Sequence, residues 1–325
     1  MTEYLIRRVL VALLIVALMM TIVFFGINVI GDPVYLLVDP SATQVQIEEA
    51  RRSLGLDQPI IVQYFHFVSS VMQGDFGRSF VFNRPAMDVI LERLPATLEL
   101  AGMAFIISLV LGIPLGLLAG LYPHSKMSKA IMAGSVLGFS LPSFWVGILF
   151  IMIFSVNLGW LPATGRGDTV DVFGIQLSFL TWDGLRHLML PALNLALFKI
   201  SVIIRLVRAG TVEVISQDFV KFARAKGVTG QRLVWKHIAK NVMVPVVTVI
   251  GMELGQLIAF SVVTETIFSW PGTGRLIIES ILQLDRPVVV AYLMMITVLF
   301  VLINLIVDVL YTWLDPRIRI GAVAK

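Results

Sequence analysis

The residues that could do chemistry are few and widely separated in this chain. The four histidines fall on four different segments: His66, His124, His187 and His237. There is no cysteine, no H-E-x-x-H zinc motif and no G-x-x-x-x-G-K-[ST] phosphate loop. Ser140, within GFSLPS, has no histidine placed to activate it, so a hydroxyl bonded to a backbone carbonyl of a kinked helix is expected. We therefore expect no catalytic residue, no metal site and no cofactor bound by this chain.

One carboxylate, Glu253, lies in the middle of a long apolar segment. An ionisable group at membrane depth is costly and usually faces a cavity or a partner. Glu253 could line a solute pathway together with Gln256 and Asn194 and meet a cationic group of the cargo. Alternatively, it could be a protonated acid or a buried partner of Lys199, Gln256 or Asn194. Lys199 is expected to extend inward toward Arg205.

A second candidate site is the basic segment DFVKFARAKGVTGQRLVWKHIAKNVMVP, residues 218–245. Its first apolar residues recur at helical spacing and are expected on one side: Phe219, Val220, Phe222 and Ala223. Gly227 suits the end of this helix, Gly230 loosens the turn, and a second short helix is expected at Gln231–Lys240. The first helix could lie on anionic lipid headgroups or insert its aromatic side chains into a groove of a partner protein.

The composition places both candidate sites in a membrane protein. The 325 residues are 58% hydrophobic and 14% charged, with a mean hydropathy of +0.90, whereas soluble domains are about 25% charged. Six segments approach or exceed the roughly 20 residues that cross a bilayer: Val9–Ile30, Leu98–Leu121, Ile131–Leu158, Leu188–Leu206, Val242–Ile267 and Val288–Leu310. The fold class expected is an all-α, polytopic membrane protein with six transmembrane helices. The first segment is interpreted as a retained signal anchor, because its apolar run is too long for a signal peptide.

Charge asymmetry orients the connections between these spans. Residues 1–8, 122–130, 205–241 and 315–325 together hold 15 Lys and Arg and four acidic residues. Residues 31–97, 159–187 and 266–287 hold nine Arg, no Lys and 13 acidic residues. Cationic loops are retained in the cytoplasm, so both termini and the basic segment are expected there. The pI of about 9.4 is interpreted as this topology signal and not as nucleic-acid binding.

Small residues and prolines indicate where spans pack or bend. Gly112, Gly116 and Gly120 recur at a spacing of four in the second span, and Gly251 and Gly255 repeat this spacing in the fifth. Such spacing lets helices approach closely in lipid. Two prolines fall inside spans and are expected to kink them: Pro114 and Pro142.

The outer segment 31–97 is the largest piece predicted outside the membrane. Thr43 and Gln46 indicate a capping box for a helix at Gln44–Leu54 that Gly55 ends. Residues 58–80 look amphipathic. The segment could be a small cap over the mouth of a pathway or a packed linker.

The basic segment resembles the cytoplasmic EAA loop of ABC-importer membrane subunits, E-A-A-x-x-x-G followed by a hydrophobic-Pro ending. Aligned on Gly227, only Ala223 and the glycine match, and the distance to Pro245 is longer than in the sugar-importer version. FVKFARAKG, residues 219–227, matches instead the loop of the peptide/nickel branch, which reads F/Y-V-x-x-A-R-A-K-G. Other segments resemble the same branch: YLIRRVL, LGLDQPIIVQY, GDFGRSF, RLPATLELA, NVMVPVVTVIG, ETIFSWPGTGR and DPRIR.

The whole chain is thus similar to the first of two permease subunits of the peptide/nickel ABC importer family (the DppB/OppB type). The resemblance implies a type I importer permease in the bacterial inner membrane. Residues 1–30 would be its N-terminal helix, 31–97 a periplasmic segment and 98–325 the importer core, with a cytoplasmic coupling loop at 208–241.

The resemblance also implies a function without catalysis and a set of partners. The partners are a second homologous permease, one or two P-loop ATPase subunits that bind ATP and Mg, a periplasmic or lipid-anchored solute-binding protein, and membrane lipid, with no nucleic acid. Coupling to the ATPases is expected from residues 218–229, through Asp218, Phe219, Phe222, Ala223, Arg224, Lys226 and Gly227. Arg224 and Lys226 would pair with acids on the ATPase. The cargo would be a di- or oligopeptide, nickel, glutathione or a similar solute.

Two other classes of transport protein remain open. A secondary transporter driven by an ion gradient would need several membrane acids and inverted repeats, whereas this chain has one central glutamate and no obvious repeat. A channel is compatible with the composition but leaves the basic segment unexplained.

Overall fold

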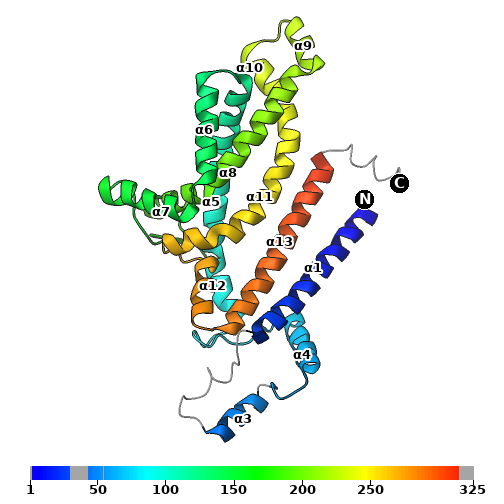
Figure 1. Cartoon of the computed structure of the whole chain (residues 1–325), viewed down its shortest axis with the longest axis vertical. Helices are drawn as coiled ribbons and strands as arrows, with labels where there is room; N and C mark the ends of the chain where they lie inside the picture. The colour runs from blue at the N-terminus through cyan, green and yellow to red at the C-terminus, as the bar shows by residue number, and fades with distance from the viewer. Residues whose placement is uncertain (1, 30–42, 54, 315–325) are drawn as a thin grey trace. The chain divides into compact units, whose positions relative to one another are not determined.

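The chain is mostly helical in the computed structural model, which describes residues 2–29, 43–53 and 55–314 (Figure 1). It divides into two compact units, which we describe separately. Unit 1 consists of Met1–Leu94 and Arg275–Leu302, and unit 2 consists of Pro95–Gly274 and Ile303–Lys325. Residues 30–42 of the predicted outer segment and the C-terminal DPRIR lie outside the described residues.

Unit 1 is built on the packing of α4 (Ile60–Met72) against α1 (Thr2–Val29) and α13 (Arg286–Leu314). The hydroxyl groups of Thr21 and Tyr64 are 2.9 Å apart and share a hydrogen bond. The ring of Phe24 meets that of Tyr64 edge to face, with centroids 5.3 Å apart. Val23 of α1 and Met294 of α13 are buried in the same apolar cluster, against which α4 packs. These contacts explain why residues 60–72 are amphipathic.

One of the two bonds of the predicted capping box in the outer segment is confirmed. The backbone N–H of Thr43 donates to Gln46 Oε1 at 2.8 Å, and α3 spans Gln44–Ser53. Gly55 has φ +66°, in the left-handed region that ends helices.

A buried carboxylate fixes the loop before α5 (Ala86–Leu121). Asp285 is completely buried, at the residue before α13. It accepts hydrogen bonds from the Ser79 hydroxyl and from the Phe80 backbone N–H at 3.1 Å. A buried charge needs such partners, so the GDFGRSF segment is held in one place by this residue.

Unit 2 contains most of the remaining elements. They are α6 (Lys126–Ser140), α7 (Ser143–Phe150), the π-helix η1 (Ile151–Asn157), β1 (Val170–Val172), β2 (Ile175–Leu177), α8 (Trp182–Ser216), α9 (Asp218–Ala225), α10 (Gly230–Leu233), the π-helix η2 (Val234–Ala239) and α11 (Lys240–Ile267). Helix α12 (Thr273–Leu282) follows, beginning in unit 2 and ending in unit 1.

The glycine spacing on α5 has the role predicted for it. A Cβ added to Gly116 would lie 2.7 Å from Cβ of Val207, and one added to Gly120 would lie 2.5 Å from Cβ of Thr211. Only glycine lets α5 and α8 approach this closely. Gly251 of α11 similarly faces Val307 of α13 within unit 2.

The third predicted span is wrong as a single helix. Helices α6 and α7 with η1 meet at an angle of 106°, with the break at Leu141 and Pro142. Pro142 has no N–H to continue α6 and precedes the first residue of α7, so it breaks the helix where a kink was predicted. Ser140 Oγ donates to the Val136 carbonyl at 2.8 Å, which confirms the expected backbone bond.

The expected all-α fold omits one β-hairpin. Strands β1 and β2 pair antiparallel, with Val172 opposite Ile175. Phe173 and Gly174 form the turn, with φ values of +55° and +82°. Alternating apolar and polar residues around a Phe-Gly pair were a usable signal, because type I′ hairpin turns need positive φ at both turn positions.

Within the described part of the chain, four helices are long and apolar enough to cross a membrane: Ile6–Gly26, Ala86–Leu121, Trp182–Ser216 and Arg286–Val307. The bent pair α6–α7 makes five if it is counted as one span. Helix α11 covers the fifth predicted span, but the apolar part identified among the described residues, Gly255–Ile267, is shorter than a bilayer needs.

Candidate functional site

The first part of the basic segment forms α9, which separates its aromatic from its small apolar residues. Val220 is 0% and Ala223 6% exposed, whereas Phe219 is 43% and Phe222 62% exposed. The prediction that all four lie on one side is therefore wrong. Positions 219 and 222 turn outward because Val220 and Ala223 fill the contact with the core. Ala223 packs against the core on the buried side of α9, so it is not accessible as a docking contact.

The buried face of α9 packs into an apolar cluster formed with five other elements. Val220 and Ala223 pack in one cluster with residues from α5, α8, α10, η2 and α11: Leu117, Ile203, Val207, Leu233, Ile238, Ala239, Val242 and Val246. A helix of eight residues is too short to be stable by itself. Its position therefore depends on this cluster.

Two glycines end α9 and let the chain turn toward the next helix. Gly227 has φ +82° and Gly230 has φ +60°. The N–H of Val228 donates to the Ala223 carbonyl at 3.1 Å, which closes the last turn. The helix predicted after Gly230 is present as α10 and η2, but it runs directly into α11 and is not a separate element.

The charged residues of α9 remain in solvent. Lys221 Nζ lies 2.9 Å from Asp218 Oδ1. The pKa of Asp218 is lowered below its usual value, mainly by the hydrogen bond from Lys221 and secondly by the positive charge of Lys221. Lys226 Nζ lies 4.5 Å from the centre of the Phe222 ring, and Arg224 is exposed. The outer face of α9 thus presents two aromatic rings bordered by cations.

The carboxylate of Glu253 is paired inside unit 2. Lys199 Nζ donates to Glu253 Oε2 and, at 2.8 Å, to Gln256 Oε1. The side chains of Lys199 and Glu253 are 5% and 15% exposed. Lys199 therefore points to Glu253 and not to Arg205, contrary to the expected inward extension. The alternative of a buried partner is confirmed for Lys199, and the pair carries no net charge.

Asn194 and Gln256 lie in the wall of a cavity of about 520 Å³. It is enclosed by the α6–α7 break together with α8 and α11, and Lys199 also lines it. Asn194 is not the partner of Glu253, because its Nδ2 donates to Thr264 Oγ1 at 3.1 Å. The structure thus brings together Asn194, Gln256 and Lys199, with Glu253 behind Lys199.

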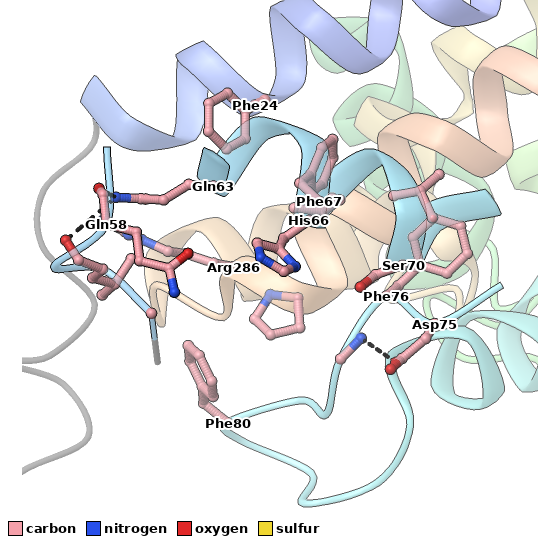
Figure 2. A pocket seen from close by; sticks show the side chains of 16 residues that line it. Phe24, Gln58, Gln63, His66, Phe67, Ser70, Asp75, Phe76, Phe80 and Arg286 are labelled. Carbon is pink, nitrogen blue, oxygen red and sulfur yellow. Dashed lines mark hydrogen bonds between the residues drawn. The ribbon is translucent and has the colours of Figure 1, made fainter. Parts of the chain in front are cut away.

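Unit 1 contains a second cavity, of about 590 Å³ (Figure 2). The rings of Phe24, Phe67, Phe76 and Phe80 border it. His66 and Arg286 are its basic residues. Asp75 accepts from the Gly77 backbone N–H at 2.9 Å and so shapes the turn beside the cavity. The motifs LGLDQPIIVQY and GDFGRSF both contribute to its wall.

Sequence reasoning missed the buried carboxylate of Glu265, although it lies in the motif ETIFSWPGTGR. Glu265 is 0% exposed and accepts from Thr97 Oγ1 at 2.8 Å and Ser261 Oγ at 2.9 Å. A Cβ at Gly272 would collide with this carboxylate. The signal was an acid followed by two closely spaced glycines, which leave room for its side chain. Glu265 thereby ties the end of α11 to α5 and to the turn before α12.

Comparisons with known proteins cover nearly the whole length of the chain. Residues 112–320 match the family described as binding-protein-dependent transport system inner membrane component, and residues 1–101 match the N-terminal family of such membrane components. The oligopeptide transport system permease protein AppB of Bacillus subtilis (strain 168) is 40% identical over 322 residues, 98% of this chain and 100% of that protein. The glutathione transport system permease protein GsiC of Escherichia coli (strain K12) is 38% identical over 320 residues, 98% of this chain and 99% of that protein.

The fold is shared with a solved transporter. A chain of the inward-facing MetNI methionine ABC transporter superposes with a TM-score of 0.57 at 18% identity, covering 70% of this chain and 96% of that one. At this identity the likeness concerns the fold alone. The family, the relatives and the apolar helices identify a multi-pass permease of the bacterial inner membrane that is a transport component. The chain belongs to the family of binding-protein-dependent transport system inner membrane components.

Proposed function

We propose that this chain forms half of the translocation pathway of an ATP-driven importer and couples to a cytoplasmic ATPase through α9. The observation that carries the proposal is the division of α9 into two faces. Phe219 and Phe222 are exposed, while Val220 and Ala223 are held in the core. Exposed aromatic anchors on a fixed helix are suited to a groove on a partner. Arg224 and Lys226 border them and can pair with acids of the ATPase.

The partners we propose follow from the family and from the lack of an ATP motif. They are a second homologous permease, one or two P-loop ATPase subunits that bind ATP and Mg, and a solute-binding protein outside. Relatives that act on oligopeptides and on glutathione favour a peptide-like cargo for this chain.

We further propose six membrane crossings, with both termini in the cytoplasm. The sixth crossing requires α11, and the fifth requires that α6, α7 and η1 cross as one bent span. Charge asymmetry supports this orientation. Because the chain has no cysteine, single cysteines can be introduced and labelled from either side. A cysteine at Phe222 should react only from the cytoplasm, and one at Phe82 only from outside. Labelling of both from one side contradicts the topology.

The coupling proposal is tested by co-purification of the tagged chain from membranes in mild detergent. Phe222→Ala, together with Phe219→Ala, should lose the ATPase subunits while retaining the second permease. Phe65→Ala is the matched control, because Phe65 is 64% exposed on α4, outside the basic segment. Retention of the ATPase by the double variant contradicts docking through α9. A chain that purifies alone and moves solute in liposomes without ATP contradicts the importer and favours a secondary transporter or a channel.

A further inference from the structure

We infer that the cavity at the α6–α7 break binds one apolar side chain of a peptide-like solute, with a backbone N–H of the solute donated to Asn194 Oδ1. The inference rests on the proposed function, because it assigns a solute contact within the proposed pathway. Three observations support it: the cavity lies at a broken helix, its wall is mostly apolar, and one residue of the wall has a polar atom without a hydrogen bond in the described part of the chain.

The broken helix needs a cavity or a protein partner beside it. The carbonyl of Gly138 would bond to the N–H of residue 142 in a continuous helix, but Pro142 has none. Irregular backbone at membrane depth is tolerated where it is buried in protein or lines a cavity. Residues 138–143 line this cavity. Interrupted helices also mark solute sites in other classes of transporter.

The wall is mostly apolar and has the size of a small-molecule site. Phe139 and Phe198 stack with their ring centres 4.7 Å apart and planes at 27°. The other apolar side chains of the wall come from α7, α8 and α11 and the break itself: Leu141, Pro142, Val146, Leu195, Leu197, Leu257, Phe260 and Val263. The volume of about 520 Å³ lies within the range of roughly 300–1,000 Å³ that small-molecule pockets occupy.

One polar atom in the wall lacks a partner. Asn194 is 3% exposed, and its Oδ1 is buried without a hydrogen bond in the described part of the chain. Its Nδ2 already donates a hydrogen bond to Thr264 Oγ1. A buried acceptor of this kind destabilises the protein until a donor arrives. A peptide N–H is such a donor.

The charges beside the cavity indicate an uncharged side chain. Lys199 lines the wall, but its ammonium group is paired with Glu253 and Gln256. The pair therefore leaves no net charge for a cargo carboxylate or ammonium group to neutralise. A charged side chain that entered would lose its hydration, which is unfavourable without a counter-ion. The guanidinium of Arg205 packs on the Phe139 ring, with its carbon 4.5 Å from the ring centre, and does not line the cavity. Leucine-like side chains fit these walls, and aspartate-like ones do not.

The test uses the assembled importer, reconstituted in lipid nanodiscs, and a dipeptide of photoreactive diazirine-leucine and glycine. After illumination, labelled residues are located by mass spectrometry. We expect labels on Phe139, Phe198, Phe260 or Val263. An excess of Leu-Gly should reduce labelling, while the same excess of Asp-Gly should not.

Two Val→Phe variants on the same helix provide a matched pair. Val263 lines the cavity and is 43% exposed, so Val263→Phe should reduce labelling by roughly tenfold. Val247 is 38% exposed on α11 and does not line the cavity, so Val247→Phe should leave labelling unchanged. Asn194→Leu should weaken labelling, and Asn194→Asp, which keeps an acceptor, should restore it in part.

ATP hydrolysis stimulated by the binding protein is measured on the same samples. If stimulation is present but the labels fall outside the cavity, or Leu-Gly does not compete, the inference is overturned while the proposed function stands. Labels that lipid alone displaces would show that acyl chains occupy the cavity and would also overturn it. If no stimulation occurs and no ATPase co-purifies, the proposed function fails and the inference with it.

Discussion

The ion pair between Lys199 and Glu253 allows the sharpest prediction, the effect of Glu253→Gln. This change keeps the shape and hydrogen-bonding capacity of residue 253 but removes the charge opposite an ammonium group that is 5% exposed. Breaking a buried pair from one side costs about 3–5 kcal/mol, because an uncompensated charge remains.

The assay is unfolding of the purified chain in mixed micelles titrated with SDS. We expect Glu253→Gln to lower the free energy of unfolding by about 3–5 kcal/mol, and the double variant Lys199→Met/Glu253→Gln to recover most of it. Asp218→Asn is the matched control, because it removes a carboxylate from a pair that is fully in solvent, and it should not change stability measurably. A loss below about 1 kcal/mol in Glu253→Gln, or a double variant less stable than either single one, would refute the reasoning.

Four further predictions follow from other contacts. Gly116→Ala should lower the free energy of unfolding by about 1–3 kcal/mol, because the added methyl group overpacks against Val207. Gly134→Ala, which has open space around it, should leave the free energy of unfolding unchanged or raise it. Both variants are measured by the same unfolding assay. Gly227→Val should abolish ATP-driven uptake while the complex still assembles, and Gly227→Asn should retain uptake, because asparagine tolerates positive φ far better than valine does; equal uptake in both variants contradicts the role of this turn. Lys221 lowers the pKa of the Asp218 carboxyl below its ordinary value of 3.8, so the ion pair is intact at pH 3.8 and above and is lost as the pH falls through the lowered pKa. Lys221→Met should return the pKa of Asp218, measured by NMR titration, toward 3.8. Glu253→Gln should reduce uptake of cationic and anionic cargo alike, because Lys199 already balances the carboxylate, and a selective loss of cationic cargo would restore the pathway-charge hypothesis.

Local patterns were sufficient for much of this fold. The glycine spacing on α5, the capping box at Thr43 and the end of α9 at Gly227 each depend on neighbouring residues or on a repeat within one helix. Pairings between distant segments could not be predicted in the same way. The direction of Lys199 depends on Glu253, 54 positions away, and the orientation of Phe219 and Phe222 depends on which face of α9 the core accepts. Pro142 was visible, but a kink and a break have the same sequence signature, and packing decides between them.

Helix α9, proposed above to couple to the ATPase, packs against a continuous run of helix that also reaches the cavity. Elements η2 and α11 extend from Val234 to Ile267 without interruption. At about 1.5 Å per residue this run is roughly 50 Å long, enough to cross a bilayer at a tilt. Near its start it packs with Val220 and Ala223 of α9, and further along it carries Gln256 and Thr264 of the cavity wall. A close-packed contact transmits displacement because it is nearly incompressible. We therefore propose that a displacement of Phe222 by a docked partner would be passed through the buried face of α9 into the helix that also lines the cavity.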